Sequence, residues 1–377
     1  MADHVEKHQF IVVGMEHYNP LGLIRSLGKY EISPIYIAIK HKCKVASLSK
    51  YVGRVHYVDT VDEAFELLVS RYGDAGTKPF VLTTDDDIQS LIDLHWDELK
   101  DKFIAFNCGI PGRTTKYMDK KEILDCASRN GLVVPSTVVV DRGTVPPNIE
   151  YPVITKSISP NDGGWKSDVF ICEDEEALKR AFEKIQSERV LVQRFIEKKN
   201  EICIDGFSIN RGKQVFLPMY TTYNYNIKGY YSPYMTAHTY DLPELDTGIQ
   251  SMFEEIGFEG IFSVEFLVDQ GGKAYFTEIN FRNSTWSYIA TTLGMPFAYL
   301  WAESMLSSSI PKDYYRQIPI DYKAMVEPID FQKRVVEGKT TLAQWLFDFR
   351  LVDCPFYFDE EDPDPFENMI ANRELLS

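Results

Sequence analysis

The chain has 377 residues, of which 44% are hydrophobic and 25% charged, a composition that excludes collagen-like, disordered and small disulfide-framework proteins. At about 100–200 residues per domain, this length predicts two or three compact units. Lys and Arg number 40 against 56 Asp and Glu, and the net charge of −16 argues against a general nucleic-acid or acidic-membrane binder.

The cysteines and the apolar runs indicate a cytoplasmic protein. No run approaches ~18 consecutive apolar residues, so no membrane span is expected. Met1–Gln9 contains no apolar signal-peptide core, which predicts that the chain is not exported. The six cysteines are scattered without a C-x-x-C pair, and we interpret them as reduced, buried thiols.

Apolar runs alternate with helical patterns in the first part of the chain. The strand-like runs are Phe10–Val13, Ile35–Ile39, Val55–Val58, Phe80–Leu82 and Phe103–Phe106, and helical patterns cover 21–27, 61–72 and 87–99. This alternation predicts a doubly wound parallel sheet in an N-terminal α/β domain over residues 1–115. Gly14 and Gly22 do not complete a G-x-G-x-x-G pattern, so a dinucleotide site is not favoured.

A second unit begins near Tyr117 and is predicted to contain antiparallel sheets. A helix over 119–130 precedes strands at 137–140, 153–155 and 169–172, a helix at 173–186, a strand at 190–196 and two antiparallel strands within 201–216. We place this unit at 116–310, divided into subdomains of about 116–192 and 193–310. The remainder, 311–377, is an extension whose aromatic segment 321–366 is expected to pack onto the body. Its acidic end, 359–377, is predicted to be a solvated terminus.

The segment Ile261–Asn283 is predicted to form a β-hairpin. Two strand-like runs flank a turn centred on Gly271-Gly272, where both positions tolerate the positive φ of a tight turn. On one face this register pairs Val264 with Ile279, Phe266 with Thr277 and Val268 with Tyr275, all directed to a core. On the other face it pairs Leu267 with Phe276, Glu265 with Glu278 and Ser263 with Asn280.

The two opposed glutamates predict a cation site. Directly opposed side chains have Cβ atoms about 4.5–5.5 Å apart, where like charges destabilise the sheet. A shared proton or an arginine would relieve the repulsion, but Mg²⁺ fits better because it takes carboxylate and amide oxygens, and Asn280 lies on the same face. Arg282 adds a cation suited to phosphate or carboxylate. The alternative is a solvent-facing strand, with Arg282 paired to one glutamate.

Lys156 ends a buried strand and precedes a polar loop over 157–167 that contains Gly163 and Gly164. A lysine beside a glycine loop suits the phosphates of a nucleotide, with the Lys166 amine as a further contact. The loop alone is equally consistent with a surface turn. The Glu/Glu/Asn pattern about 110 residues later makes the nucleotide interpretation more specific.

These motifs together resemble the ATP-grasp superfamily. The matching residues are Asp119-Lys120, Tyr151–Lys156, Val192–Ile196, Val264–Phe266 and Glu278–Arg282, and the resemblance covers roughly residues 1–306. It implies a two-subdomain ATP-grasp fold with ATP between the subdomains and two Mg²⁺ ions, replaceable by Mn²⁺, on the acidic hairpin. By the same resemblance, Lys120 and Lys156 contact phosphates, Gln193, Arg194, Phe195 and Ile196 bind adenine, Glu201 binds the ribose, Glu265, Glu278 and Asn280 hold metal, and Arg282 lies near the acyl phosphate.

Within the superfamily, two segments resemble amino-acid ligases. Tyr223–Tyr230 is similar to the closing loop of D-alanine ligases, which implies that Lys228 reaches the γ-phosphate; the alternative is a Tyr-rich surface loop. Asn280–Tyr288 is most like the D-aspartate ligase type, although Phe281 replaces the proline of that type's Asn-Pro-Arg. This resemblance implies that a substrate carboxylate docks on Arg282, Ser284 and Ser287 beside Tyr288.

The resemblance implies an ATP-dependent ligase that joins a carboxylate to an amine through an acyl phosphate. His238 is a candidate base, although a lone His is more often structural. Glu16, His17 and Asn19 are expected near the acceptor side of the cleft, and a homodimer is possible. One alternative is a carboxylase or carbamoyl-phosphate-type enzyme that phosphorylates bicarbonate, because the segment Asp162–Lys166 faintly resembles the glycine loop of biotin carboxylases. The other is a nucleotide-binding module without catalysis.

Overall fold

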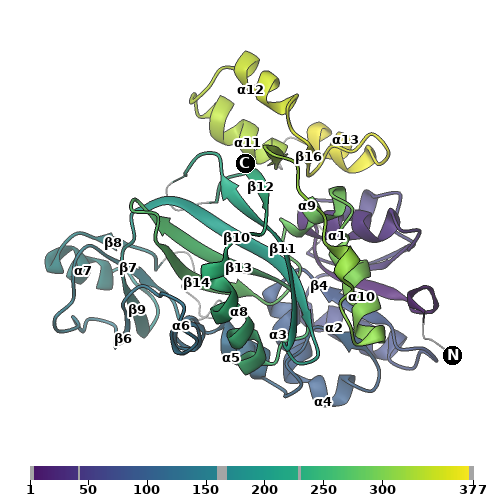
Figure 1. The fold of residues 1–377 in the computed structure, drawn as a ribbon, viewed down its shortest axis with the longest axis horizontal. Helices are drawn as coiled ribbons and strands as arrows, with labels where there is room; N and C mark the ends of the chain where they lie inside the picture. The colour runs from purple at the N-terminus through teal and green to yellow at the C-terminus, as the bar shows by residue number, and fades with distance from the viewer. Residues whose placement is uncertain (1–3, 41–42, 159–167, 228–230, 373–377) are drawn as a thin grey trace.

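The computed structural model describes residues 4–40, 43–158, 168–227 and 231–372. Figure 1 shows three sheets with their helices. Residues from all three units line one cleft. None of the helices in these ranges combines the length and the apolar character needed to cross a bilayer.

The N-terminal domain contains the predicted parallel sheet. Its strands are β1 (Phe10–Met15), β2 (Ile35–Ile39), β3 (Arg54–Val58), β4 (Phe80–Thr83) and β5 (Ile104–Ala105), in the order β3-β2-β1-β4-β5. The helices are α1 (Tyr18–Gly28), α2 (Val61–Tyr72), α3 (Asp86–Leu94) and α4 (Trp96–Leu99), with short 3-10 turns at Val5–Lys7 and Ala46–Leu48. The strand order reverses between β1 and β4, and the carboxyl ends of these two strands lead to Tyr18 and Asp86 on the cleft.

A small antiparallel sheet forms one wall of the cleft. It consists of β6 (Thr137–Asp141), β7 (Val153–Lys156), β8 (Ile171–Cys172) and β9 (Arg189–Arg194), in the order β6-β9-β7-β8. Helix α7 (Glu175–Phe182) buries Leu178 and Phe182 in the core of this sheet. Helices α5 (Arg113–Met118) and α6 (Lys120–Arg129) precede it, and Asp119 caps α6 by accepting the backbone N–H groups of Lys121 and Glu122.

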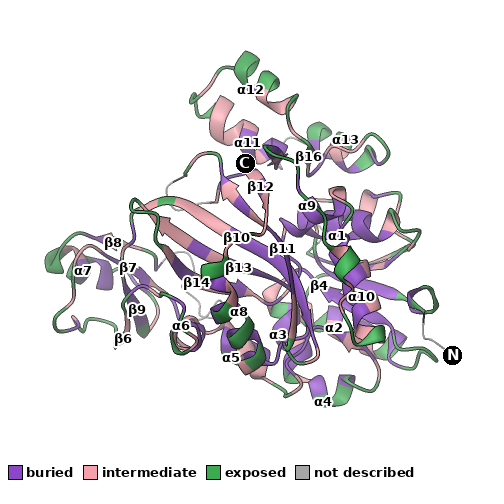
Figure 2. Ribbon diagram, viewed as in Figure 1, coloured by how far each residue is buried: buried purple, intermediate pink, exposed green. Residues whose placement is uncertain are grey.

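A seven-stranded sheet forms the opposite wall. Its strands are β10 (Lys198–Ile209), β11 (Gln214–Tyr223), β12 (Tyr234–Thr239), β13 (Gly260–Asp269), β14 (Ala274–Asn280), β15 (Tyr322–Met325) and β16 (Cys354–Pro355), in the order β14-β13-β10-β11-β12-β15-β16. Helices α8 (Pro243–Ile256), α9 (Ser287–Thr292) and α10 (Phe297–Ser307) cover it. The sheet is largely buried at β10 and β13 (Figure 2), and Trp301 of α10 contacts Phe80 and Phe106 of the N-terminal domain, so the two units share a core.

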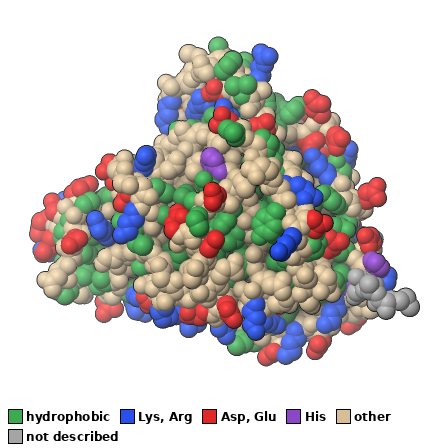
Figure 3. Space-filling view, in the orientation of Figure 1, with side chains coloured by type: hydrophobic (Ala, Val, Ile, Leu, Met, Phe, Trp, Pro, Cys, Tyr) green, Lys and Arg blue, Asp and Glu red, His purple; other side chains and the backbone are tan. Residues whose placement is uncertain are grey.

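The C-terminal segment extends the large sheet and then returns to the N-terminal domain. After a 3-10 turn at Lys312–Tyr314, strands β15 and β16 add to the sheet edge, and α11 (Glu327–Phe331), a π-helical turn (Gln332–Val336) and α12 (Leu342–Phe349) form a protrusion. Hydrophobic side chains are visible on the surface of that protrusion (Figure 3). Leu342 and Phe347 are among its exposed residues. The predicted packing of the aromatic segment onto the body is confirmed for Trp345 and Phe356, which are buried, but it is wrong for Phe347, which is 58% exposed.

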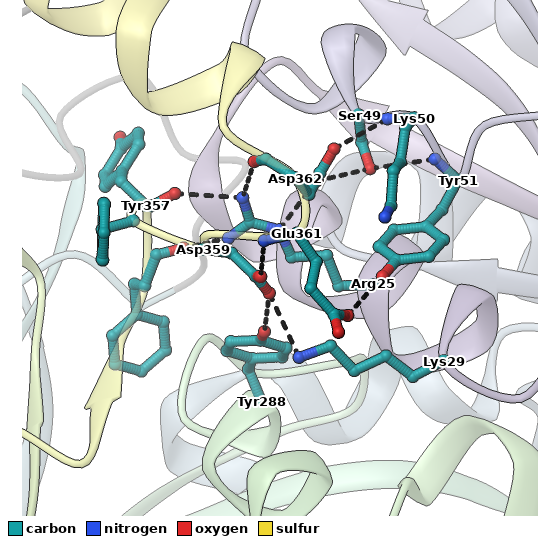
Figure 4. Close-up of polar contacts among 12 residues, drawn as sticks. Arg25, Lys29, Ser49, Lys50, Tyr51, Tyr288, Tyr357, Asp359, Glu361 and Asp362 are labelled. Atoms are coloured by element: carbon teal, nitrogen blue, oxygen red, sulfur yellow. Dashed lines mark hydrogen bonds and ion pairs between the residues drawn. The ribbon is translucent and has the colours of Figure 1, made fainter.

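The prediction of a solvated acidic terminus is wrong for Asp362, Pro365 and Met369, which are buried, whereas Glu360, Glu361, Asp364 and Glu367 are exposed as predicted. Helix α13 (Asp364–Ala371) lies beside the N-terminal domain, and Asp362 is 1% exposed. Its carboxylate accepts a hydrogen bond of 2.9 Å from Arg25 Nε, and Arg25 also donates to the backbone carbonyls of Phe356 and Tyr357 (Figure 4). A buried arginine on α1 thus neutralises an acid that composition alone assigns to solvent.

Candidate active site

The acidic hairpin is present, with the predicted register at the site. Glu265 pairs with Glu278, and Ser263 pairs with Asn280. Glu265, Glu278 and Asn280 all line the cleft, as does Arg282, which follows β14. The opposed carboxylates therefore lie on one face of the sheet and border a space that can admit a ligand.

Nearer the turn, the predicted register is wrong by one residue. A β-bulge at Thr277 shifts the pairing, so that Phe266 pairs with Phe276 and Leu267 with Tyr275. The Thr277 hydroxyl donates to the carbonyl of Glu265 at 2.9 Å, which holds the bulge closed. As a result Tyr275, and not Phe276, shares the cleft face with Leu267.

The electrostatics of the glutamate pair favour a bound cation. Enclosure within the protein raises the pKa of Glu265 well above its usual range, and the nearby Glu278 raises it further. Asn280 Nδ2 donates to Glu265 Oε1 at 2.8 Å. The described residues contain no group of three His, Cys, Asp or Glu side chains arranged for a metal. The two carboxylates nevertheless supply the oxygen donors that Mg²⁺ prefers, so they fit the predicted ion, whereas the Asn280 amide directs its nitrogen at Glu265 and its oxygen at Arg282.

Arg282 is held by a residue that the sequence did not indicate. Its Nε and Nη2 atoms bind the two carboxylate oxygens of Asp86 at 2.9 and 3.2 Å, and Nη2 also donates to Asn280 Oδ1 at 3.0 Å. The predicted alternative, pairing with a glutamate of the hairpin, is therefore not the contact observed. Asp86 lies at the start of α3, directly after β4. The run Asp85–Asp87 at the end of a parallel strand was the signal that could have identified it.

Two lysines face the hairpin across the cleft, which has a volume of about 1740 Å³. Lys156 ends β7, its Nζ donates to Gln193 Oε1 at 3.1 Å, and Lys120 begins α6. Enclosure in the cleft lowers the pKa of Lys156, and Lys120 lowers it further, whereas Glu278 opposes the effect. The volume exceeds the ~300–1,000 Å³ of a typical small-molecule pocket, so it can hold a nucleotide and a second ligand.

The predicted adenine segment, Gln193–Ile196, also lines the cleft. However, the backbone N–H of Arg194 donates to Ser136 O at 2.8 Å, and that of Phe195 donates to Pro152 O at 2.9 Å. Both amides are thus used within the small sheet, so an adenine ring would need other backbone groups of this strand.

Glu201 lines the cleft at the start of β10. Its carboxylate forms an ion pair with Lys198, which lies at the beginning of the same strand. The predicted ribose acid is therefore in the cleft, already balanced by a lysine. Gly163, Gly164, Lys166 and Lys228 lie outside the described residues.

The predicted substrate residues are only partly brought together. Ser284 lines the cleft beside Thr285 and Trp286. Ser287 and Tyr288 instead line a small separate cavity near α1, and the Tyr288 hydroxyl donates to Asp359 at 3.4 Å. His238 lies on β12, where it hydrogen-bonds the Thr222 hydroxyl at 2.8 Å and stacks on Tyr220, and it is not among the cleft-lining residues.

The N-terminal candidates near the acceptor side have structural contacts. Glu16 accepts the backbone N–H groups of Val45 and Ser47, and Asn19 forms a hydrogen bond of 2.7 Å with Asn283. His17 lies beside them and caps α1. Enclosure within the protein, and to a lesser extent the positive charge of Arg282, lowers the pKa of His17 to about 4. Asn19 therefore joins the N-terminal domain to the segment after Arg282, whereas the contacts of Glu16 and His17 lie within that domain, and none of the three is among the cleft-lining residues.

Sequence reasoning also missed an aromatic end wall and a buried acid. Tyr18, Tyr231 and Trp286 line the cleft near Arg282, and the hydroxyls of Tyr18 and Tyr231 are 2.5 Å apart. Beneath Ser284 lies Asp205 of β10, which is 0% exposed. Tyr18, Tyr231, Trp286 and Asp205 come from separate segments, and no local pattern links them.

Comparison with known proteins gives the fold but no sequence relative. No family model and no curated protein matches the chain. Among solved structures, N5-carboxyaminoimidazole synthetase from Staphylococcus aureus superimposes with a TM-score of 0.65 at 14% identity, over 88% of this chain and 86% of that one. An L-amino acid ligase from Bacillus licheniformis has a TM-score of 0.64 at 14% identity, over 82% and 78% of the two chains.

A biotin carboxylase from Campylobacter jejuni, solved as an ATP complex, also has a TM-score of 0.64, at 15% identity over 82% of this chain and 73% of that one. These proteins are ATP-grasp enzymes. The similarity confirms the predicted architecture: a parallel α/β sheet followed by antiparallel sheets around a cleft, which is the ATP-grasp fold.

Proposed function

We propose that this protein is an ATP-dependent ligase that joins the carboxylate of an amino acid to an amine. A carboxylate oxygen attacks the γ-phosphorus of ATP, giving an acyl phosphate and ADP. The amine nitrogen then attacks the acyl carbon, and the carbon–oxygen bond to phosphate breaks. Phosphorylation is needed because a free carboxylate is a poor electrophile near neutral pH.

The observation that carries this proposal is the opposition of Glu265 and Glu278 to Lys156 across one cleft. An acidic pair that needs a cation, facing a lysine, matches the requirements of a magnesium–nucleotide complex. The fold supports the same interpretation, because the solved structures that superimpose on this chain include an amino acid ligase and an ATP complex.

The chain's own residues then have distinct tasks. Glu265, Glu278 and Asn280 would hold magnesium, as two ions in the ATP-grasp pattern, with manganese as a substitute; the metal supplies charge neutralisation and orientation of the phosphates. Lys156 and Lys120 bind phosphate oxygens. Arg282, held by Asp86, faces the reacting carboxylate. We assign the chain to the D-aspartate ligase type on the resemblance of the segment Asn280–Tyr288.

The test is a coupled ADP-release assay with amino acids supplied as paired acids and amines. Glu278→Gln removes one carboxylate of the pair and is expected to lower Mg²⁺-dependent ADP release by about 100-fold or more. Glu244→Gln, an exposed change on α8, is the matched control and should retain full activity.

Two results would contradict the proposal. Full Mg²⁺-dependent turnover of Glu278→Gln would remove the assigned ligand role. ADP release that requires bicarbonate alone would favour a carboxylase. This is the second candidate function, because a biotin carboxylase and an N5-carboxyaminoimidazole synthetase are among the structures that superimpose on this chain.

A further inference from the structure

A buried carboxyl group lies directly behind the substrate end of the cleft. Asp205 pairs across the sheet with Ser263, and Ser263 pairs with Asn280, so Asp205 occupies the cross-strand row next to the glutamate pair. Ser284 donates its hydroxyl proton to Asp205 Oδ1 and accepts the backbone N–H of Trp286 at 3.1 Å. Ser284 lines the cleft whereas Asp205 does not, so Ser284 separates the acid from the ligand space.

Among the residues that the structure describes, the surroundings of Asp205 contain hydroxyls and no paired cation. Within the described residues, Asp205 Oδ2 has no hydrogen bond of standard geometry, the Ser263 hydroxyl lies close enough to lower the pKa of Asp205, and Ser287 reaches only Oδ1, at 3.4 Å. A buried carboxylate without a cation is costly, so burial favours the protonated form of Asp205.

Charged and titratable groups face Asp205 from few directions. The neighbouring cross-strand pair consists of Cys203 on β10 and Glu265 on β13. Arg282 follows β14, but its guanidinium forms an ion pair with Asp86. On the other side β11 places Met219 opposite Asp205. Among the described residues, α9 adds the Ser287 hydroxyl.

We propose that Ser284 and Asp205 form a proton relay that deprotonates the acceptor amine during amide formation. The inference rests on the proposed ligase function and deepens it. It answers a chemical need, because amines arrive as ammonium ions and must lose a proton before nitrogen can attack. His238, the base suggested by the sequence, is not among the residues that line the cleft.

The step balances as follows. One ammonium proton passes to Ser284 Oγ while the Ser284 proton passes to Asp205 Oδ1, which leaves Asp205 neutral. The nitrogen lone pair forms the bond to the acyl carbon, and the carbon–oxygen bond to phosphate breaks with its electron pair on oxygen. The second nitrogen proton leaves with the departing phosphate.

The ionisation of Asp205 suits this task. Burial raises the pKa of the Asp205 carboxyl to about 7, against the hydroxyls of Ser284 and Ser287, which lower it. A group with a pKa near the working pH is present in its basic form and still accepts a proton effectively. Ser284 would be the catalytic residue that touches the amine, and Asp205 the residue that acts through it.

Hydroxylamine separates this relay from a structural role. It is largely unprotonated at neutral pH and attacks acyl phosphates without a base, so it reports acid activation alone. For Asp205→Asn and Ser284→Ala we expect hydroxamate formation to be retained while amide formation with an ordinary primary amine falls by about 100-fold. The rate of amide formation by the wild-type protein should also rise with pH around a midpoint of about 7, and this rising limb of the pH–rate profile should be missing in Asp205→Asn.

The matched controls are Asp93→Asn and Ser208→Ala. Asp93 is a buried carboxylate bonded to Thr115, and Ser208 is a buried hydroxyl on β10 bonded to Phe258 O; neither lines the cleft. Both controls should leave the ratio of amide to hydroxamate unchanged.

Three outcomes overturn the relay. Amide and hydroxamate formation that fall together in Asp205→Asn and Ser284→Ala would indicate a structural role. A pH limb retained in Asp205→Asn would exclude this acid. Absence of Mg²⁺-dependent hydroxamate formation by the wild-type protein would reject the ligase proposal and the relay with it. If Asp205→Asn does not fold, the smaller change Ser284→Ala gives the decisive comparison.

Discussion

The buried carboxyl of Asp205 makes a prediction about stability that is independent of catalysis. Its pKa is about 7 in the folded protein against an ordinary 3.8, so between these values the folded chain holds a proton that the unfolded chain has released. The free energy of unfolding should therefore fall as pH rises from about 4 to 7. The difference corresponds to about 4 kcal/mol.

Asp205→Asn removes this dependence, and urea unfolding of both proteins at pH 5 and pH 8 measures it. The free energy of unfolding of the variant minus that of wild type should be larger at pH 8 than at pH 5. An equal stability difference at the two pH values would show that Asp205 is ionised in the folded state throughout this range.

Single residues also show where sequence reasoning stops. Glu265, Glu278 and Asn280 could be brought together in advance because they share one hairpin, whose geometry is local. Asp86 was indicated only by the acidic run Asp85–Asp87 after a strand, and Asp205 by no local pattern, since each reaches the site from another strand. A contact between distant segments depends on how sheets pack, which the periodicity of one strand does not encode.

At the scale of the element, the hairpin was predicted but its bulge was not. A register counted from the turn assumes that both strands advance residue for residue, and the extra residue Thr277 breaks that assumption. The site pairs were right nevertheless. Asp269 N donates to Lys273 O, so the loop between the strands contains Gln270 in addition to Gly271 and Gly272. The extra residue Thr277 on the second strand restores the predicted pairing at Glu265.

The two turn glycines differ, and this gives a matched pair of substitutions. Gly272 has a φ of +86° and open space where a Cβ would lie, whereas Gly271 is not in the left-handed region. We expect Gly272→Ala to destabilise the protein by about 1 kcal/mol, and Gly271→Ala to cost less. Thermal unfolding of the two variants compares them. A greater loss for Gly271→Ala would contradict the turn geometry described here.

At the scale of the whole molecule, the chain closes on itself through its C-terminal segment. Strands β15 and β16 extend the large sheet, and the segment that follows is held by Arg25 of α1 and by Glu327, whose carboxylate accepts the backbone N–H groups of Phe356 and Phe358. Phe356 and Tyr357 in turn pack behind Trp286 and Tyr18 on the cleft wall. The C-terminal segment thus supports the substrate end of the cleft from outside.

The last prediction concerns this closure. Arg25 and Asp362 are 0% and 1% exposed, so Arg25→Met would leave a buried carboxylate without its cation and should destabilise the protein by about 3–5 kcal/mol. Lys29→Met is the matched control, because Lys29 forms a pair of 3.1 Å with Asp359 but is 32% exposed, and such pairs contribute about 0–1 kcal/mol. Urea unfolding measures both changes, and limited proteolysis should cleave the C-terminal segment of Arg25→Met first. Similar losses in the two variants would show that Asp362 does not depend on Arg25 for its burial, and the C-terminal segment would then be held chiefly by the aromatic contacts of Phe356 and Tyr357.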